Sequence, residues 1–172
     1  MTDLGLKKED SSTQKNNKMS NIESKLTALG ITLPTPAVPV ANYVGFVKSG
    51  NIIFVSGQLP IEAGKLQFIG KVGSEISADD AKKAARLCAI NILAQLKVAC
   101  DGDLERTVRC IKLGIFVNGD ADFKDHPAVA NGASDLMVEA LGDAGKHARA
   151  AVGSGSLPFG VAVEVDAIFE IK

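Results

Sequence analysis

The C-terminal segment Val161-Ala-Val-Glu-Val-Asp-Ala-Ile-Phe-Glu-Ile171 is the part of the sequence that best defines the fold. Every second residue in it is apolar, and the positions between them include Glu164, Asp166 and Glu170. Because successive side chains of a strand point to opposite faces of a sheet, this alternation predicts a β-strand with one buried and one polar face. Such a strand needs neighbouring strands as partners for its backbone hydrogen bonds.

Five further strands are predicted upstream, at residues 43–47, 51–56, 66–70, 107–117 and 149–152. The first two flank a Ser49-Gly50 turn, so they should form a hairpin. The third follows an Ala63-Gly64 turn, and the fourth shows the same alternation of apolar residues in its second half.

Two long helices are predicted between these strands. Ser77 and Asp80 have the spacing of an N-terminal cap, and apolar residues then recur at helical intervals as far as Gly102. Pro127 suits the first turn of a second helix, which ends before Gly142. The order β-β-β-α-β-α-β-β predicts an α/β domain with one sheet and both long helices on a single face. The other face would remain exposed and apolar, so we expect the chain to oligomerise.

The N-terminal region divides into two parts. Residues 1–18 are rich in charged and polar residues, so we expect a disordered extension or a cloning remnant there. Residues 19–172 would form a single domain. It opens with a short helix, which starts at a Ser20–Glu23 capping box, and a proline-rich arm, together residues 19–40.

Composition excludes several classes of function. The formal net charge is −1 and the pI is about 6.1, which favours neither a nucleic-acid partner nor an anionic membrane surface. No apolar run approaches the roughly 20 residues that span a bilayer. The three cysteines form no C-x-x-C pair and are expected to be reduced thiols, as in a cytoplasmic protein. His126 and His147 lack the spacing of a metal motif, so no metal site is expected.

Arg149 is the unusual residue of its predicted strand, because its neighbours are small or apolar. A guanidinium in that setting offers a planar, permanently charged fork that suits a carboxylate ligand. A structural salt bridge to Glu164, Asp166 or another acid explains it equally well at this level.

Four other positions have both a functional and a structural interpretation. Glu164 is either a solvated carboxylate on the outer face or a group that orients water and moves protons. Gly57, after Ser56, permits either a close backbone approach to a ligand or a sharp turn, and the turn is the more common case. Tyr43 more often packs in a hairpin core than binds a ligand, and Asn131 is normally a surface residue.

Several motifs together resemble the RidA/YjgF family, also named the endoribonuclease L-PSP family. Arg149-Ala-Ala-Val152, then Leu157-Pro158, then Val163-Glu-Val-Asp-Ala-Ile168 is similar to the family's C-terminal signature, with the same spacing from the arginine to the glutamate. Asn51-Ile-Ile-Phe-Val-Ser-Gly-Gln-Leu-Pro60 resembles its first hairpin, and Tyr43 stands where the family has a pocket tyrosine. The resemblance extends from about residue 38 to the C-terminus.

This resemblance implies a chorismate-mutase-like fold with a mixed sheet, a homotrimer, and ligand pockets in clefts between subunits. It implies hydrolysis of reactive enamines and imines, such as 2-aminoacrylate, to 2-keto acids and ammonia, without a metal or organic cofactor. Arg149 would bind the carboxylate of the small metabolite, and Glu164 would orient the attacking water. The remaining substrate-binding residues would be Ser56 and Gly57 of the first hairpin. Tyr43 and Asn131 would line the pocket from a neighbouring chain.

Three departures from the family pattern bear on activity. Ala151 replaces a cysteine that many members carry, residues 153–156 form a more flexible loop, and residues 20–40 extend beyond the shortest members. A metabolite-binding or regulatory trimer without turnover is therefore an alternative to the deaminase. Ribonuclease activity is the weakest hypothesis, because the chain is mildly acidic, has one tyrosine and no tryptophan, and lacks a His/Lys catalytic set.

Overall fold

The computed structural model describes residues 21–36 and 42–172 of the chain. Three of the sequence-based predictions fall outside these residues: the disordered extension at residues 1–18, the capping residue Ser20, and the end of the proline-rich arm. Within the described residues, none of the helices is long and apolar enough to cross a membrane.

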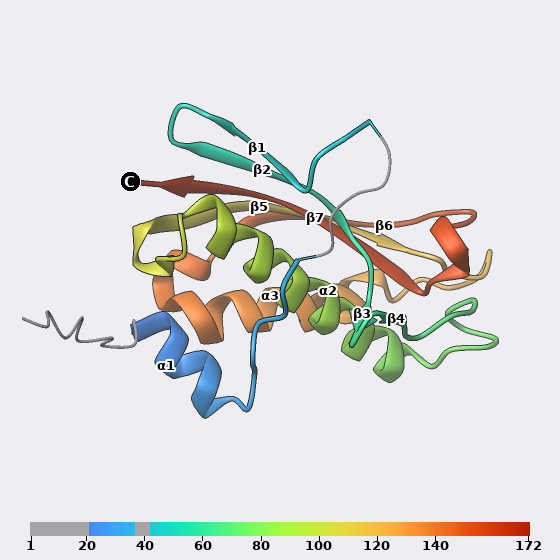
Figure 1. The fold of residues 1–172 in the computed structure, drawn as a ribbon. Coiled ribbons are helices and arrows are strands. Elements are labelled where there is room, and N and C mark those ends of the chain that lie inside the picture. The colour runs from blue at the N-terminus through green and yellow to red at the C-terminus, as the bar shows by residue number, and fades with distance from the viewer. Residues whose placement is uncertain (1–20, 37–41) are drawn as a thin grey trace, which may run out of the picture.

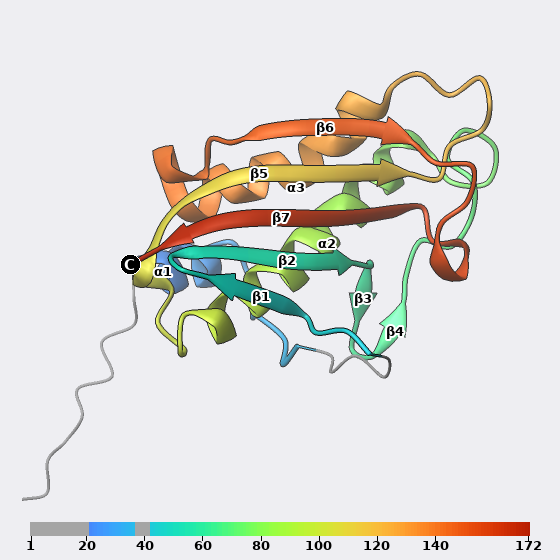
Figure 2. The same ribbon diagram turned by 90° about the horizontal axis from the view of Figure 1, so that it is seen from above.

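One five-stranded sheet forms the centre of the molecule (Figure 2). Its order is β1-β2-β7-β5-β6, and only β5 and β6 are parallel, so the predicted mixed sheet is confirmed. The strands are β1 (Phe46–Ser49), β2 (Ile52–Gln58), β5 (Thr107–Val117), β6 (Ala148–Gly153) and β7 (Val163–Ile171).

The two long helices, α2 (Ala78–Ala99) and α3 (His126–Leu141), cover the same face of this sheet, as predicted (Figure 1). The Ser77 hydroxyl accepts a hydrogen bond from the backbone N–H of Asp80 at 3.0 Å and so caps α2. α2 packs against β2 and β7, and α3 packs against β5 and β6. The helices also contact each other closely, since a Cβ added at Gly132 would lie 1.9 Å from the carbonyl oxygen of Lys82.

The alternation predicted for the last strand is present throughout β7. Its inner residues, Val163, Val165, Ala167, Phe169 and Ile171, are all buried against the helices. The residues between them lie on the outer face and are only partly buried. This face carries exposed apolar side chains, Val47, Phe54 and Val152, each about half exposed, together with the carboxylates of β7. The exposed face is therefore partly apolar and partly charged, so it is less apolar than the sequence led us to expect.

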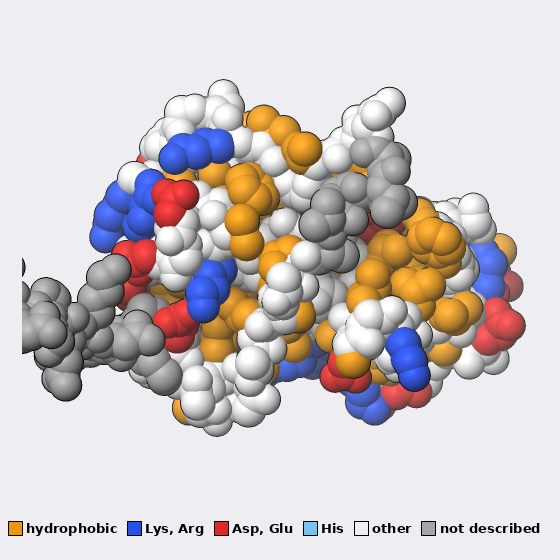
Figure 3. Space-filling view, in the orientation of Figure 1, with side chains coloured by type: hydrophobic (Ala, Val, Ile, Leu, Met, Phe, Trp, Pro, Cys, Tyr) orange, Lys and Arg blue, Asp and Glu red, His pale blue; other side chains and the backbone are white. Residues whose placement is uncertain are grey.

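The third predicted strand, residues 66–70, is wrong. Ile61–Glu62 (β3) and Lys65–Leu66 (β4) instead form a separate two-stranded hairpin. The chain cannot continue as a strand after it, because Phe68 and Gly70 have φ angles of 52° and 137°. Figure 3 shows that hydrophobic side chains gather near this hairpin, on the right of the view.

Short elements complete the fold. The predicted N-terminal helix is confirmed as α1 (Asn21–Ala28), which buries Ile22 and Leu26. Residues 42–172 also contain three 3-10 turns: η1 (Leu104–Arg106), η2 (Gly142–Gly145) and η3 (Pro158–Gly160). The turn η2 lies two residues before β6.

Candidate functional site

Arg149 lies in the edge strand β6, with its side chain directed towards α3. Nη1 donates to Asn131 Oδ1 at 2.8 Å and to Ser134 Oγ at 3.1 Å, and Nη2 donates to the carbonyl oxygen of Pro127 at 3.4 Å. These three acceptors are spaced four and three residues apart on α3, so they form one stripe of the helix. Asn131 was expected to arrive from a neighbouring chain, but it contacts Arg149 of its own chain.

All three acceptors of Arg149 are neutral, and no described carboxylate forms an ion pair with it. The alternative of a structural salt bridge is therefore wrong for the described residues. Nε donates to none of the described residues, and the one bond of Nη2 is long. The edge formed by Nε and Nη2 is the one that binds a carboxylate side-on through two parallel hydrogen bonds. An exposed, unbalanced positive charge with this edge available is suited to a small carboxylate.

Two further residues of this cluster were not identified from the sequence. Ser134 Oγ lies 3.0 Å from His147 Nε2, and His147 Nδ1 lies 2.6 Å from the carbonyl oxygen of Gly145. His147 also lines an open groove of about 580 Å³ with Arg109 and Lys146. The position of His147 two residues before Arg149 was the available signal, because alternate residues lie on the same side of an extended segment.

Glu164 lies on the outer face of the sheet, against Gly57. A Cβ at Gly57 would lie 2.0 Å from Glu164 Oε1, so only glycine leaves room for the carboxylate in this position. Burial, and secondarily the charge of Asp166, raises the pKa of Glu164 above its ordinary value. A half-buried carboxyl with a raised pKa exchanges protons more readily near neutral pH than an ordinary glutamate does.

The interpretation of Gly57 as a turn residue is wrong. It lies within β2, at the place where the pairing with β7 shifts register between Val55 and Gln58. The preceding hydroxyl, Ser56 Oγ, donates to the carbonyl oxygen of Val44 at 2.6 Å and thereby secures the segment before β1. Tyr43 precedes β1 and is 59% exposed, so it is not a hairpin core residue either.

Arg149 and Glu164 are not brought together within one chain. Leu113 of β5 pairs with both Arg149 and Ala167, and it is buried against the helices. Glu164 pairs with Phe116, three residues further along β5, so its side chain points to the opposite face. Because β5 separates β6 from β7, the two backbones also lie about 10 Å apart.

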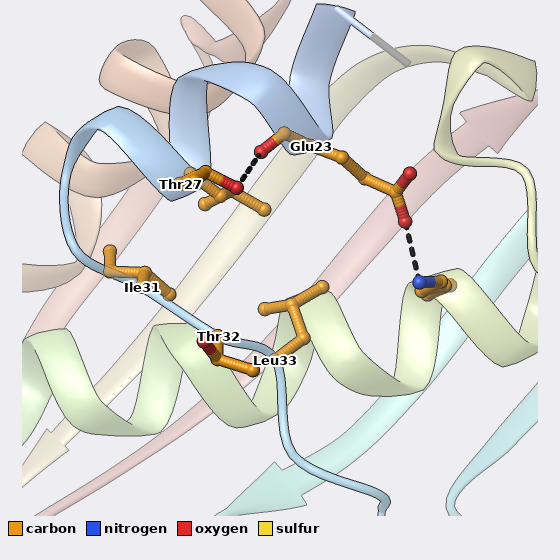
Figure 4. A pocket seen from close by; sticks show the side chains of 7 residues that line it. Glu23, Thr27, Ile31, Thr32 and Leu33 are labelled. Atoms are coloured by element: carbon orange, nitrogen blue, oxygen red, sulfur yellow. Dashed lines mark hydrogen bonds and ion pairs between the residues drawn. The ribbon is translucent and has the colours of Figure 1, made fainter. Parts of the chain in front are cut away.

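A separate hollow of about 260 Å³ lies between α1 and α2 (Figure 4). Leu26, Ile31 and Leu33 form its apolar walls, and an ion pair between Glu23 and Lys97, 2.5 Å long, bridges the two helices. None of the predicted site residues lines it. Among residues 21–36 and 42–172, no three His, Cys, Asp or Glu side chains are grouped so that they could hold a metal ion.

Comparison with known proteins identifies the family. A family model described as "YjgF/chorismate_mutase-like, putative endoribonuclease" matches residues 23–170. The chain belongs to the RidA/YjgF family. Protein TCP17 of Trypanosoma cruzi is 44% identical over 152 residues, which cover 88% of this chain and 94% of TCP17.

Two solved structures have similar backbones to different degrees. The crystal structure of Atu1372 from Agrobacterium tumefaciens, a protein of unknown function, is 52% identical, with a TM-score of 0.84 over 88% of this chain and 92% of that one. RidA from the Antarctic bacterium Psychrobacter sp. PAMC 21119 is 31% identical, with a TM-score of 0.54 over 82% and 97%. The backbone is therefore closer to that of Atu1372 than to that of this RidA.

Proposed function

We propose that this member of the RidA/YjgF family hydrolyses 2-imino acids, formed from enamines such as 2-aminoacrylate, to 2-keto acids and ammonia. The observation that carries the proposal is Arg149, whose guanidinium is held by neutral oxygens. Its Nε donates to none of the described residues, and its Nη2 makes one long bond, to the carbonyl oxygen of Pro127. A 2-imino acid has the carboxylate that the Nε–Nη2 edge binds.

The chemistry required of the protein is modest. The oxygen of a water molecule adds to the imine carbon, the electron pair of the C=N bond moves to nitrogen, and nitrogen takes up a proton. The C–N bond then breaks, ammonia leaves, and the carbinol oxygen loses its proton to become the keto oxygen. Holding the carboxylate and one water in position supplies most of the acceleration by orientation. Glu164, with its raised pKa, would take the proton from water and return it to the departing nitrogen.

No thiol is needed in this scheme. Ala151 stands where many members of the family carry a cysteine, and it faces α3 on the same side of β6 as Arg149. The three cysteines of the chain are all buried. Burial raises the pKa of the Cys110 thiol to about 12, which leaves it protonated and unreactive at neutral pH.

The proposed reaction needs Arg149 and Glu164 on the same substrate, although one chain holds them on opposite faces of its sheet. A homotrimer would solve this geometry, since the exposed edge strand β6 of one subunit can approach the outer face of the next. Under this proposal Arg149 and Asn131 form one half of the pocket, and Gly57 and Glu164 of the adjacent subunit form the other.

One experiment tests both the activity and this arrangement. Imines are generated in the cuvette by an amino-acid oxidase, and semicarbazide traps those that the protein has not hydrolysed. The wild type should suppress trapping, whereas Arg149→Ala and Glu164→Gln should each fail to do so. Subunits of the two variants, co-expressed with different tags and purified as mixed trimers, should regain activity, because about one in three of their sites would combine two intact halves.

Each outcome has a definite meaning. Recovery in the mixed oligomer supports a pocket shared by two subunits, and absence of recovery with an active wild type shows that the pocket lies within one chain. An inactive wild type that still binds a 2-keto acid through Arg149 would replace the deaminase with a metabolite-binding trimer. A monomeric mass in light scattering would rule out the shared pocket.

A further inference from the structure

We infer that Ser134 and His147 are positioning residues that orient the guanidinium of Arg149 through a directional chain of hydrogen bonds ending at the backbone of Gly145. The consequence for ligand binding rests on the proposed function, but the hydrogen-bond chain itself does not. Neither residue was singled out for a role in the sequence, and neither needs to touch the substrate.

The direction of the chain follows from the chemistry of its last member. The carbonyl oxygen of Gly145 can only accept, so the proton of His147 must lie on Nδ1, 2.6 Å away. The Nε2 atom of the neutral ring is then an acceptor, and Ser134 must donate its single hydroxyl hydrogen to it across 3.0 Å. The lone pairs of Ser134 Oγ are left for Nη1 of Arg149, at 3.1 Å.

Gly145 provides a rigid end for this chain. It is buried in η2, and a Cβ added there would lie 2.1 Å from the carbonyl oxygen of Met137, a backbone atom of α3 that cannot move aside. The close contact fixes η2 against the same helix that carries Ser134. The carbonyl acceptor and the serine are therefore held by one rigid unit, with His147 bridging them.

The chain controls the plane of the guanidinium. Both hydrogens of Nη1 lie in that plane, and they point to two different acceptors, Asn131 Oδ1 and Ser134 Oγ. Without Ser134, the group would be held only by Asn131 and by the long bond from Nη2 to the carbonyl oxygen of Pro127. With Ser134, both Nη1 hydrogens have short acceptors, which hold the plane, and hence the direction of the Nε–Nη2 edge, more firmly. Without its bond to His147, the Ser134 hydroxyl could turn its hydrogen towards Arg149 and lose this acceptor function. Pre-orientation of this kind reduces the rotamer entropy lost when the carboxylate binds.

The test combines a measurement on the free protein with a ligand titration. In nitrogen-15 NMR spectra, the imidazole of His147 should show the Nδ1–H tautomer without any ligand present. Calorimetric titration with pyruvate should show weaker binding, by roughly five- to tenfold, in Ser134→Ala and in His147→Asn. The asparagine amide can still donate to Gly145 but has no atom at the position of Nε2. The double variant should bind no more weakly than either single variant, because both remove the same chain.

Two matched variants separate positioning from general damage. Ser134→Thr keeps the hydroxyl and should recover most of the affinity, and Ser74→Ala, in the exposed loop before α2, should bind as the wild type does. All variants should keep their melting temperature within about 3 °C of the wild type.

Failure of this inference is distinguishable from failure of the proposed function. An Nε2–H tautomer at His147 would overturn the hydrogen-bond chain whatever the protein binds. Additive losses in the double variant, or wild-type affinity in both single variants, would overturn the positioning role while leaving carboxylate binding by Arg149 intact. Unchanged pyruvate affinity in Arg149→Ala would instead reject the proposed function and, with it, the consequence for binding.

Discussion

The two candidate halves of the site, around Arg149 and around Glu164, differ in the surroundings of their charged groups. Arg149 is exposed at a sheet edge, and every described acceptor around it is neutral. Glu164 is half-buried on the outer face, close to a second carboxylate, and its pKa is raised by burial and then by Asp166. Arg149 therefore presents a positive charge without a counter-ion among the described residues, whereas the surroundings of Glu164 disfavour its ionised form.

This difference indicates a division of labour. An unbalanced guanidinium attracts and orients an anion, and gains most when that anion brings the missing charge. A carboxyl whose ionised form is disfavoured is better suited to moving protons than to holding a salt bridge. Carboxylate binding should therefore depend on the Arg149 half, and turnover should depend on both.

The largest expected effect is that of Arg149→Ala. Losing a charge-assisted bidentate contact costs about 2–5 kcal/mol, so pyruvate binding should weaken by at least roughly 30-fold and become undetectable by calorimetry. Arg149→Lys should recover only part of the affinity, because a point charge does not reproduce the fork. Arg109→Ala, another exposed arginine of the same sheet, serves as the control. An alanine variant that melted early but bound normally would assign Arg149 to stability instead.

A smaller and more selective effect is expected for Glu164→Gln. Removing a general acid–base group typically lowers turnover by about 10²–10⁴-fold. Pyruvate affinity should stay within about threefold of the wild type, since the carboxylate is bound by the other half. Steady-state rates measure the turnover, and calorimetry on the same preparation measures the pyruvate affinity. Equal losses in both quantities would mean that the two halves do not divide the work.

Gly57→Ala should perturb the same half indirectly. The new Cβ would overlap Glu164 Oε1, which can swing aside because it ends a flexible side chain, so the fold should survive. A displaced carboxylate should lower turnover by about tenfold, with pyruvate binding unchanged. Gly155→Ala is the matched control, because a Cβ there meets no atom within 4 Å. Normal turnover in Gly57→Ala would show that the position of Glu164 is not critical.

The smallest expected effect is on stability. Because the folded pKa of Glu164 lies above its ordinary value, the folded chain binds that proton more tightly than the unfolded chain does. Stability contributed by this group is therefore present at low pH and is lost as pH rises through the folded pKa. Glu164→Gln should raise the melting temperature by about 1–3 °C near pH 8 and have almost no effect near pH 4.

Glu170→Gln, on the same face of β7, is the comparison for this measurement. Its side chain lies at the other end of the strand and accepts a hydrogen bond from Asn51. A stabilisation by Glu164→Gln that did not vary with pH would contradict an origin in the ionisation of Glu164.

Local sequence patterns were sufficient for most of the fold. The alternation in β7, the capped apolar stripe of α2 and the proline at the start of α3 each predicted the element that is present. The strand at residues 66–70 failed for a local reason that composition conceals, namely the positive φ of Phe68. An apolar run predicts burial or extension, but it does not show where the backbone must turn.

The candidate site was only partly predictable. Arg149 was conspicuous among small residues, and Glu164 and Gly57 carried the family motif, so the sequence by itself supplied the candidate residues and the family. The sequence could not show whether Arg149 has a salt-bridge partner. It also could not show that Ser134 accepts a hydrogen bond from Arg149 and lies within hydrogen-bond distance of His147. Those facts depend on the parallel pairing of β5 with β6 and on the packing of α3. Register between strands that are distant in sequence is set by long-range packing rather than by any local pattern, and for this reason only the tertiary structure shows that Arg149 and Glu164 point to opposite faces.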